Sequence, residues 1–477
     1  MDFDLSKRHC WYFHQISRIP RGSRNEKAVS DYICSFAKEH GLPYRQDAVY
    51  NVMIDKPASK GYEDSPSVIL QAHIDMVCEK NEDVVHDFEK DPLDLYTEDG
   101  WLKARGTTLG ADDGFGVAYM LAILEDETIP HPPLECIFTV QEEIGLLGAA
   151  KLKAADLHGH RYISLDGGGG GVCEISCAGA QDAYFRLKAV SLPSIFPMYE
   201  LSVRGLLGGH SGGKIHMERG NANLIACRIL KEIQRAGYSV TLSDLRGGQK
   251  ENAIPREAFF RFVCNAPYEE LHHTAEKSAA AIRSELQFSD PGAEITLRQC
   301  EEPAACFPQE VSDRLLNFIF LMPHGYLHHS MAVEGLTTVS LNLGVIRWKE
   351  DRVEYSVMIR AAEDSARKNI AHRLSVLADL LGMEQEFSKG YPGWAYTKES
   401  ELRKIMKQAV EEKGLRYEEI ATHGGLECGL IRGLDPMMDI ITLGPVVKDI
   451  HSPEERMNLK SFDDMYEVLR KILENCR

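Results

Sequence analysis

The stretch SVILQAHIDM, residues 67–76, decides the fold. Its apolar beginning predicts a buried strand over 67–72, and the chain becomes polar directly afterwards at His73 and Asp75. In an open α/β sheet, ligands bind where strands end and loops begin. The stretch therefore predicts an α/β fold with a polar site at the end of this strand.

The same change from an apolar run to polar turn residues recurs along the chain, for example after LECIFTV (134–140) and RYISL (161–165). Acidic and histidine side chains stand at these positions: His73 and Asp75, Asp112, Glu142 and Glu143, Asp166, and His451. Carboxylates and imidazoles that converge at one edge of a sheet suit two divalent metal ions bridged by an oxygen. Such a site favours a hydrolytic function.

The first part of the chain predicts a mixed, mostly parallel sheet covered by helices. Residues 26–40 have the apolar spacing of an amphipathic helix, residues 114–126 are apolar at helical spacing, and 145–153 are expected to begin a further helix. Helices that alternate with buried strands are typical of a parallel sheet with both faces covered.

The sequence texture changes after about residue 182. Half-exposed strands with a period of two, such as RVEYSVMIRAA (352–362), accompany amphipathic helices at 221–237 and 268–286. Near residue 390 a Gly/Pro-punctuated segment leads back to alternating helices and strands. We therefore expect an α/β catalytic domain formed by 1–182 and 391–477, and an α+β lid domain inserted at 183–390.

Composition excludes several classes of protein. The 477 residues are 44% hydrophobic and 26% charged, and the net charge is −18, which argues against nucleic-acid binding. The N-terminal segment lacks an apolar signal core, and no apolar run of about 18 residues occurs. Twelve cysteines are scattered without a CxxC pair. These observations predict a cytoplasmic protein that does not contact a membrane, with inert buried thiols at Cys78 and Cys428.

Taken singly, the motifs also have ordinary structural interpretations. His73 and Asp75 fit a polar pair at a strand end, and Asp112 fits the N-cap of a helix. Glu142 and Glu143 are more informative, because adjacent strand residues face opposite sides and can share a site only after the strand has ended. One of them can then bind a metal ion while the other accepts a proton. The five glycines after Asp166 are not followed by the Lys-Ser/Thr of a phosphate loop.

In combination the motifs resemble a known family. GTTLGADDG (106–114), QEEIGLLGA (141–149), HSGGKIHMERGNAN (210–223) and ENAIPREA (251–258) resemble the dizinc peptidase family that contains carnosinases, aminoacylases and bacterial dipeptidases. The resemblance covers essentially the whole chain. It implies hydrolysis of dipeptides with free termini, Xaa-His substrates included, by a metal-bridged water.

The resemblance also implies roles for single residues. The implied metal ligands are His73, Asp112, Glu143, Asp166 and His451, with Asp112 bridging the two ions. Glu142 would be the general base, and Asp75 would orient His73. Two Zn²⁺ ions are implied, and Mn²⁺ or Co²⁺ are open alternatives because oxygen ligands also suit them.

Three residues of the inserted domain are implied to bind substrate. His210 resembles the lid histidine that polarises the scissile carbonyl, although a structural role fits its spacing equally well. Arg360 matches an arginine for the substrate carboxylate, for which a guanidinium is suited. Asn252 is expected to add a hydrogen bond. HGGLECG (423–429) resembles a substrate loop, but related members carry Asp where Glu427 stands.

Other interpretations stay open at this point. A deacylase of N-acyl amino acids or a carboxypeptidase would use the same metal centre, and the long insertion favours the dipeptidase. A non-catalytic binding protein is disfavoured because every expected ligand and the base are present. Lid domains of this family often mediate dimers, so a homodimer is a further expectation. The preferred side chains, and whether His210 acts within its own chain, are not predicted.

Overall fold

The computed structural model describes residues 3–302 and 304–477, which form two compact units. The first unit comprises the chain up to Cys177 together with Trp394–Ala421 and Leu426–Arg477. The second comprises Ala178–Gly393 and the short return Thr422–Gly425. The predicted domain borders, after 182 and 390, fall a few residues from these crossings. The short return to the second unit lies outside the prediction.

The first unit is built on a six-stranded sheet in the order β1-β2-β6-β3-β7-β23. Its strands are β1 (Tyr44–Gln46), β2 (Val52–Lys56), β3 (Val68–His73), β6 (Leu134–Thr139), β7 (Arg161–Ser164) and β23 (Asp439–Thr442). The four strands β6, β3, β7 and β23 run parallel, and β1 and β2 join antiparallel at one edge. The predicted mixed, mostly parallel sheet is confirmed.

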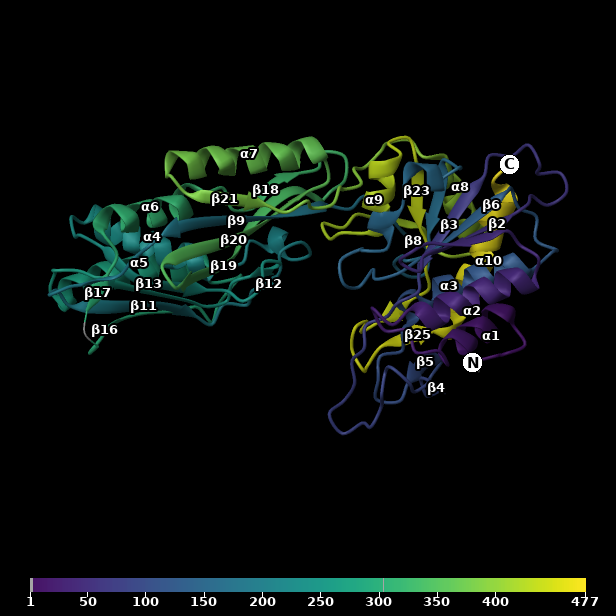
Figure 1. The fold of residues 1–477 in the computed structure, drawn as a ribbon, viewed down its shortest axis with the longest axis horizontal. Helices are drawn as coiled ribbons and strands as arrows, with labels where there is room; N and C mark the ends of the chain where they lie inside the picture. The colour runs from purple at the N-terminus through teal and green to yellow at the C-terminus, as the bar shows by residue number, and fades with distance from the viewer. Residues whose placement is uncertain (1–2, 303) are drawn as a thin grey trace. The chain divides into compact units, whose positions relative to one another are not determined.

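Helices cover both faces of this sheet (Figure 1). They are α1 (Arg8–Ile16), α2 (Lys27–Glu39), α3 (Ala111–Glu125), α8 (Glu401–Glu412), α9 (Glu427–Leu434) and α10 (Leu459–Asn475). On one face Ile69 and Tyr162 pack with Ile431 of α9. On the other, α3 lies so close that a Cβ on Gly116 would be 2.9 Å from that of Ala72. Because α3 is apolar on all sides, it is buried along nearly its whole length.

Two small sheets complete the first unit. The first is antiparallel in the order β24-β25-β5-β4, and the second is the parallel pair β22-β8. Their strands are β4 (Leu95–Glu98), β5 (Trp101–Ala104), β8 (Val172–Glu174), β22 (Glu418–Ile420), β24 (Val447–Lys448) and β25 (Arg456–Asn458). The loop between β24 and β25 carries His451.

Two local predictions need correction. The helix expected to begin within 145–153 is wrong: only a single 3-10 turn, η1 (Ala149–Lys151), forms there. Gly145 and Leu146 have φ values of 117° and 61°, in the left-handed region that a right-handed helix excludes. The burial predicted for Cys78 is also wrong, because the thiol lies in an exposed loop. Cys428 is buried as predicted.

The second unit contains a nine-stranded antiparallel sheet in the order β16-β11-β15-β13-β19-β20-β9-β21, with β18 beside β19. Its strands are β9 (Gly179–Lys188), β11 (Met198–Arg204), β13 (Thr241–Gly247), β15 (Ala258–Val263), β16 (Glu294–Gln299), β18 (Gly325–His329), β19 (Thr337–Lys349), β20 (Arg352–Ala361) and β21 (Glu384–Phe387). Short pairs are β10 (Leu192–Pro193) with β17 (Ala305–Cys306), and β12 (Gly209–His210) with β14 (Ala253–Ile254).

Four helices pack on this sheet: α4 (Ala222–Arg235), α5 (Tyr268–Glu285), α6 (Gln309–Leu321) and α7 (Asp364–Leu380). Figure 1 shows them along one side of the strands. Between sheet and helices lies one apolar core, with Phe185, Phe260, Leu230 and Leu315 among its fully buried members. Buried and partly exposed residues alternate in β15 and β9, as their period of two predicts. The predicted α+β layer is confirmed.

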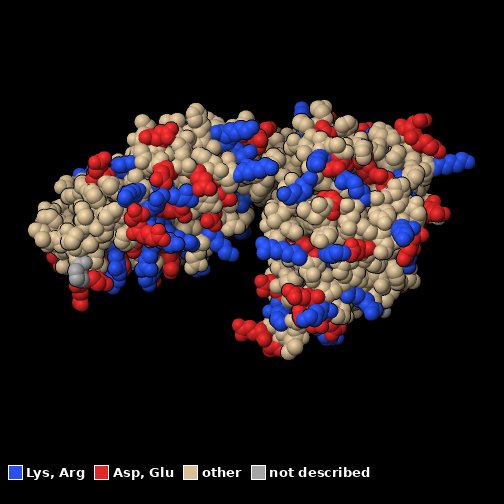
Figure 2. Space-filling view, viewed as in Figure 1, with Lys and Arg blue, Asp and Glu red and all other residues tan. Residues whose placement is uncertain are grey.

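Charges on the face seen in Figure 2 are mixed, with Lys and Arg interspersed among Asp and Glu. The net charge of −18 is therefore not gathered into one acidic field on this face. All twelve cysteines are free thiols. Within the described residues, no helix has both the length and the apolar content that crossing a bilayer requires.

Candidate metal centre and the residues around it

The five predicted ligands lie at strand ends and loops of the first unit: His73 at the end of β3, Asp112 at the start of α3, Glu143 after β6, Asp166 after β7, and His451 between β24 and β25. They form two groups whose potential ligand atoms lie within 4.8 Å of one another. One group is His73, Asp112 and Asp166, and the other is Asp112, Glu143 and His451. Each offers one imidazole and two carboxylates, and Asp112 belongs to both. A further group with the same spacing joins His73 and Glu143 to Glu142, the predicted base.

His73 is fully buried and held on both ring nitrogens. Its Nε2 lies 3.0 Å from Oδ1 of Asp112, and its Nδ1 lies 3.1 Å from the backbone carbonyl oxygen of Asp75. The Asp75 carboxylate is also near, with Oδ1 at 3.5 Å from Nδ1. A proton on Nδ1 leaves the Nε2 lone pair free to face the acidic group. This geometry suits a histidine ligand oriented through its other nitrogen.

Asp75 connects the His73 strand to the glutamate pair. Its carboxylate accepts hydrogen bonds from the backbone N–H of Glu142 at 3.0 Å and of Glu143 at 3.4 Å, and from the Ser23 hydroxyl at 2.8 Å. Burial opposes ionisation of Asp75, but His73 and these donors hold its pKa below the usual value. Asp75 therefore fixes both the imidazole and the start of the glutamate turn.

The glutamate pair and His451 form the second side of the site. His451 Nε2 lies 3.0 Å from Oε1 of Glu143 and 3.4 Å from Oδ2 of Asp112. The hydrogen bonds to these carboxylates raise the pKa of His451 to about 10. Burial, together with the neighbouring carboxyl groups of Glu427, Glu143 and Asp112, raises the pKa of Glu142 to about 8. Glu142 can therefore bind a proton near neutral pH.

The electrostatics of the cluster favour bound cations. Burial and the charge of Asp112 raise the pKa of Asp166 well above its usual value. Without positive charge, several carboxylates in this small volume must therefore bind protons or leave like charges unbalanced. Two divalent ions bound to the two groups would relieve this repulsion, and His and carboxylate side chains are suitable ligands for them. The donor set fits a dinuclear metal centre.

A buried polar layer that the sequence interpretation did not identify lies directly beneath the site. Oε2 of Glu427 accepts from the Thr139 hydroxyl at 2.7 Å and from Gln71 Nε2 at 2.5 Å. The side-chain amide oxygen of Gln71, Oε1, accepts from the Ser164 hydroxyl at 2.9 Å. The layer thus ties β3, β6 and β7 to the first residue of α9. The sequence does contain a signal for this layer. Gln71 and Ser164 each stand two residues before a predicted ligand, so each side chain faces the same side of its strand as that ligand.

The predicted substrate residues lie in the second unit. His210 Nδ1 accepts the backbone N–H of Gly213 at 3.0 Å and of Gly212 at 3.3 Å, so the ring proton of neutral His210 is on Nε2. Arg360 Nη2 lies 3.4 Å from this Nε2. Arg360 is 4% exposed, and its Nη1 has no hydrogen-bond partner among the described residues. Arg360 Nε donates to the Ser211 hydroxyl at 3.4 Å, so Nη1 is the donor of this guanidinium that lacks an acceptor among the described residues.

Asn252 and His423 lie beside this pair. The Asn252 backbone carbonyl accepts the Ser211 N–H at 2.8 Å, next to the pairing of β12 with β14, while the residue itself is exposed. His423, in the short return segment, lies with Nε2 2.7 Å from the Ser340 hydroxyl. Burial and the charge of Arg360 lower the pKa of His423 to about 3, so it is neutral at physiological pH. His423 was not predicted as a site residue.

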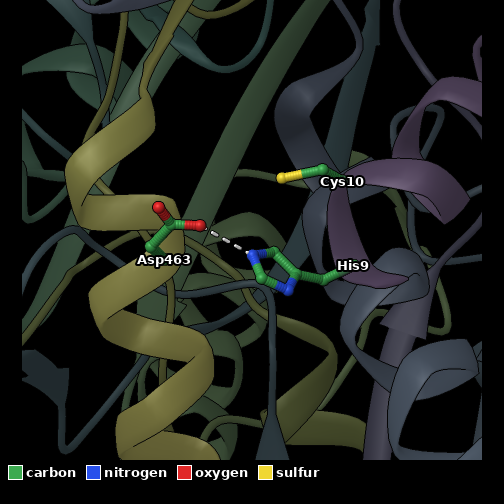
Figure 3. A group of neighbouring side chains, drawn as sticks. All are labelled: His9, Cys10 and Asp463. Carbon is green, nitrogen blue, oxygen red and sulfur yellow. Dashed lines mark hydrogen bonds and ion pairs between the residues drawn. The ribbon is translucent and has the colours of Figure 1, made fainter. Parts of the chain in front are cut away.

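A separate histidine and acid cluster, His9, Cys10 and Asp463, is of a different kind (Figure 3). His9 Nε2 lies 2.9 Å from Oδ1 of Asp463, while Lys7 Nζ lies 2.5 Å from Oδ2. The ring of His9 also stacks on Tyr466 at 4.4 Å. Burial raises the pKa of the Cys10 thiol to about 12, so the thiolate that binds metals is not formed. With a lysine ammonium on the carboxylate, this cluster is a structural ion pair.

Comparison with known proteins assigns the family. The model of "Peptidase family M20/M25/M40" matches residues 69–475. The chain belongs to this peptidase family. The match spans both units and includes every predicted site residue. The family predicted from the GADDG, QEEIG and HSGGK motifs is confirmed.

Individual members of the M20/M25/M40 family differ in their similarity to the chain. The cytosol non-specific dipeptidase of Escherichia coli is 35% identical over 98% of both chains. The crystal structure of aminoacylhistidine dipeptidase from Vibrio alginolyticus has 36% identity and a TM-score of 0.91, and covers 98% of this chain and 96% of that one. Aminopeptidase PepT from Bacillus cereus has 15% identity and a TM-score of 0.57 over the full length of both chains, a likeness of fold alone.

Proposed function

We propose that this member of the M20/M25/M40 family is a dinuclear metallodipeptidase that hydrolyses dipeptides with free termini, Xaa-His dipeptides among them. The observation that carries the proposal is the position of Asp112 in both ligand groups, with Glu142 beside them. The similarity along 98% of the chain to a cytosol non-specific dipeptidase and to an aminoacylhistidine dipeptidase supports the substrate class.

In this proposal His73 and Asp166 hold one ion, Glu143 and His451 hold the other, and Asp112 is shared. Bound divalent ions supply Lewis acidity, which lowers the pKa of water and polarises a carbonyl oxygen. Zinc is the ion we expect, because His and carboxylate ligands suit it, and manganese or cobalt are the alternatives. The first unit is then the catalytic domain, and the second is the lid domain.

Glu142 acts as the general base. It follows a strand that ends at Thr139, and the Asp75 carboxylate holds its backbone N–H, which fixes the start of the turn that carries it. Bound divalent ions would lower the pKa of Glu142 from the raised value of the metal-free site, so the carboxylate would be ionised and able to accept a proton. Glu142 takes the proton of the attacking water and delivers it to the leaving amine.

His210 and Arg360 bind the acceptor groups of the substrate. The Nε2 proton of His210 is free to donate to the oxygen of the scissile carbonyl, on which negative charge develops. The unpartnered Nη1 of Arg360 suits the C-terminal carboxylate, since a guanidinium pairs well with a carboxylate. Asn252 adds a hydrogen bond beside them. A requirement for a free carboxylate next to the cleaved bond would explain a preference for very short peptides.

Turnover of a small substrate panel tests this function. The panel contains β-Ala-His, Gly-His, Leu-Gly, a tripeptide and an N-acetylated dipeptide, each with protein loaded with Zn²⁺, Mn²⁺ or Co²⁺ and with a chelator control. We expect chelator-sensitive cleavage of the free dipeptides. Cleavage of only the acetylated peptide would assign a deacylase or carboxypeptidase. No cleavage of any peptide, with two metal ions bound, would contradict the proposal.

We expect a cytoplasmic enzyme, in keeping with the name of the curated relative and the free thiols. A homodimer, expected from the family resemblance, would be tested by the molar mass of the protein in solution.

A further inference from the structure

Glu455 is a buried carboxylate with no place in the proposed catalytic steps. It is 2% exposed and lies four residues after His451. Its Oε2 accepts the backbone N–H groups of residues 109 and 110 at 2.8 and 3.0 Å, and its Oε1 accepts those of residues 111 and 112 at 2.9 and 3.3 Å. One side chain therefore binds four consecutive amides, the last of them the amide of Asp112.

Arg21 lies on the other side of the same loop. Its Nη1 donates to the backbone carbonyls of Ile74 and Asp75, both at 3.0 Å, and its Nη2 donates to the carbonyl of Gly110. The side chain is 2% exposed. Its hydrogen bonds connect the segment after His73 to the loop before Asp112. The guanidinium ion is buried next to the negative charges of Glu455 and Asp75.

The chain leaves room for this guanidinium by having glycine at two nearby positions. A Cβ on Gly110 would lie 2.7 Å from Arg21 Nη2, and a Cβ on Gly114 would lie 2.6 Å from the same atom. Gly110 also has a φ of 63°, which other residues rarely adopt. The glycines of GADDG therefore fit Arg21 as well as the turn.

We propose that Glu455 and Arg21 are positioning residues that set the distance between the three ligand-bearing segments ending at His73, Asp112 and His451. Glu455 couples the His451 loop to the Asp112 loop through backbone amides, and Arg21 couples the Asp112 loop to the segment after His73. Neither side chain is among the metal-binding groups or the proposed substrate contacts. Groups that orient metal ligands typically change metal affinity or activity by about 10–100-fold when they are replaced. The inference rests on the proposed metal centre.

Glu455→Gln is the decisive variant. It preserves the shape of the side chain but replaces one acceptor oxygen with an NH₂ donor that faces two backbone donors. We expect its affinity for the more weakly held of two Co²⁺ ions to fall about 10–100-fold, with an altered visible spectrum of bound Co²⁺. The matched control is Glu454→Gln, because Glu454 is the exposed neighbour and should bind both ions as the native protein does.

Arg21→Lys is the second variant. It preserves the charge but cannot place donors on the three carbonyls with the geometry of a planar guanidinium. Its Co²⁺ affinity and spectrum should change in the same direction. Val29→Ala, in the buried face of α2, lowers stability but removes none of the hydrogen bonds made by Glu455 or Arg21, so it should retain the native spectrum and controls for general destabilisation.

The outcomes separate this inference from the proposed function. Failure of the native protein to bind two divalent ions would contradict the metal centre itself. Native-like Co²⁺ affinity and spectrum in both Glu455→Gln and Arg21→Lys would contradict the positioning role and leave the metal centre intact. If Glu455→Gln does not fold, Glu455→Asp decides the matter: it retains both acceptors on a shorter stem, and native-like Co²⁺ binding by it would overturn the inference.

Discussion

The two units use their sheets in opposite chemical ways. The parallel strands β3, β6 and β7 of the first unit end side by side and bring acceptors together, namely carboxylates and imidazole lone pairs that need cations. In the second unit, antiparallel β20 and the short β12–β14 pair carry the donors Arg360 and His210, which need an acceptor. We therefore assign metal binding to the first unit. We assign the recognition of substrate oxygens to the second unit.

The largest effect is expected from Asp112→Asn. Asp112 belongs to both ligand groups, so its replacement should remove or weaken both ions, whereas His451→Asn should affect one. Turnover should fall by more than about 10³-fold. Loss of a single hydrogen-bond donor to the transition state typically lowers turnover by about 10²–10³-fold, and the loss of a shared metal ligand should exceed this. Metal content by elemental analysis and dipeptide turnover check this, with exposed Asp64→Asn as control. If the Asp112→Asn protein still binds two ions tightly, Asp112 is not a ligand shared by both ions.

Arg360→Lys should leave the metal content unchanged and lower kcat/KM by about 10²-fold, because the ammonium cannot replace the planar fork of donors. The loss should appear for substrates with a free C-terminal carboxylate and disappear for their amides. Exposed Arg204→Lys in the same sheet is the control. A change in metal stoichiometry in Arg360→Lys would contradict the division between the units.

Replacement of Glu427 tests the polar layer beneath the ligands. Glu427→Met removes the shorter of the two acceptors of the Gln71 amide and of the Thr139 hydroxyl and leaves only longer hydrogen bonds, so metal affinity should fall about 10-fold. Glu427→Gln retains an acceptor oxygen at the Oε2 position and should stay within about threefold of the native affinity. Isothermal titration with Zn²⁺ compares the two variants. Equal losses in both would assign the role to the charge of Glu427 rather than to its hydrogen bonds.

The smallest effect concerns the pH dependence of stability in the second unit. The pKa of His423 is lowered to about 3, so the unfolded chain binds a proton below pH 6.5 that the folded chain excludes. Stability should therefore decrease as pH falls, by about 2 kcal/mol between pH 7 and 5. His423→Gln should remove this component while a hydrogen bond to Ser340 is kept. Urea unfolding at the two pH values measures the difference, and an unchanged dependence would contradict the buried neutral state.

Much of the architecture follows from local patterns in the sequence. The apolar runs at 67–72 and 134–140 become β3 and β6, and the helical spacing at 221–237 becomes α4, because burial on one or both faces fixes the period of side chains. The positions of His73, Glu143 and Asp166 follow from the same rule, since they stand at or after the ends of β3, β6 and β7, whereas Asp112 begins α3 and His451 lies in a loop. Their roles came from the family resemblance and await the experiments above.

Features that depend on distant segments did not follow from the sequence. Glu427 reaches Gln71 across 356 positions, and Glu455 reaches the amide of Leu109 across 346, so no local pattern links them. The short return at Thr422–Gly425 places His423 with the second unit although the surrounding chain belongs to the first. The expected helix within 145–153 was wrong because the left-handed Leu146 is a backbone property that composition does not reveal.

The central claim is that Glu142 is the base of a dinuclear centre held by the first unit, and Glu142→Gln tests it most directly. The account predicts that this variant still binds two divalent ions, while kcat for a free dipeptide falls about 10²–10⁴-fold, the range for loss of a general base. Exposed Glu63→Gln should be native-like in both measurements. Near-native turnover by Glu142→Gln with two ions bound would contradict the account.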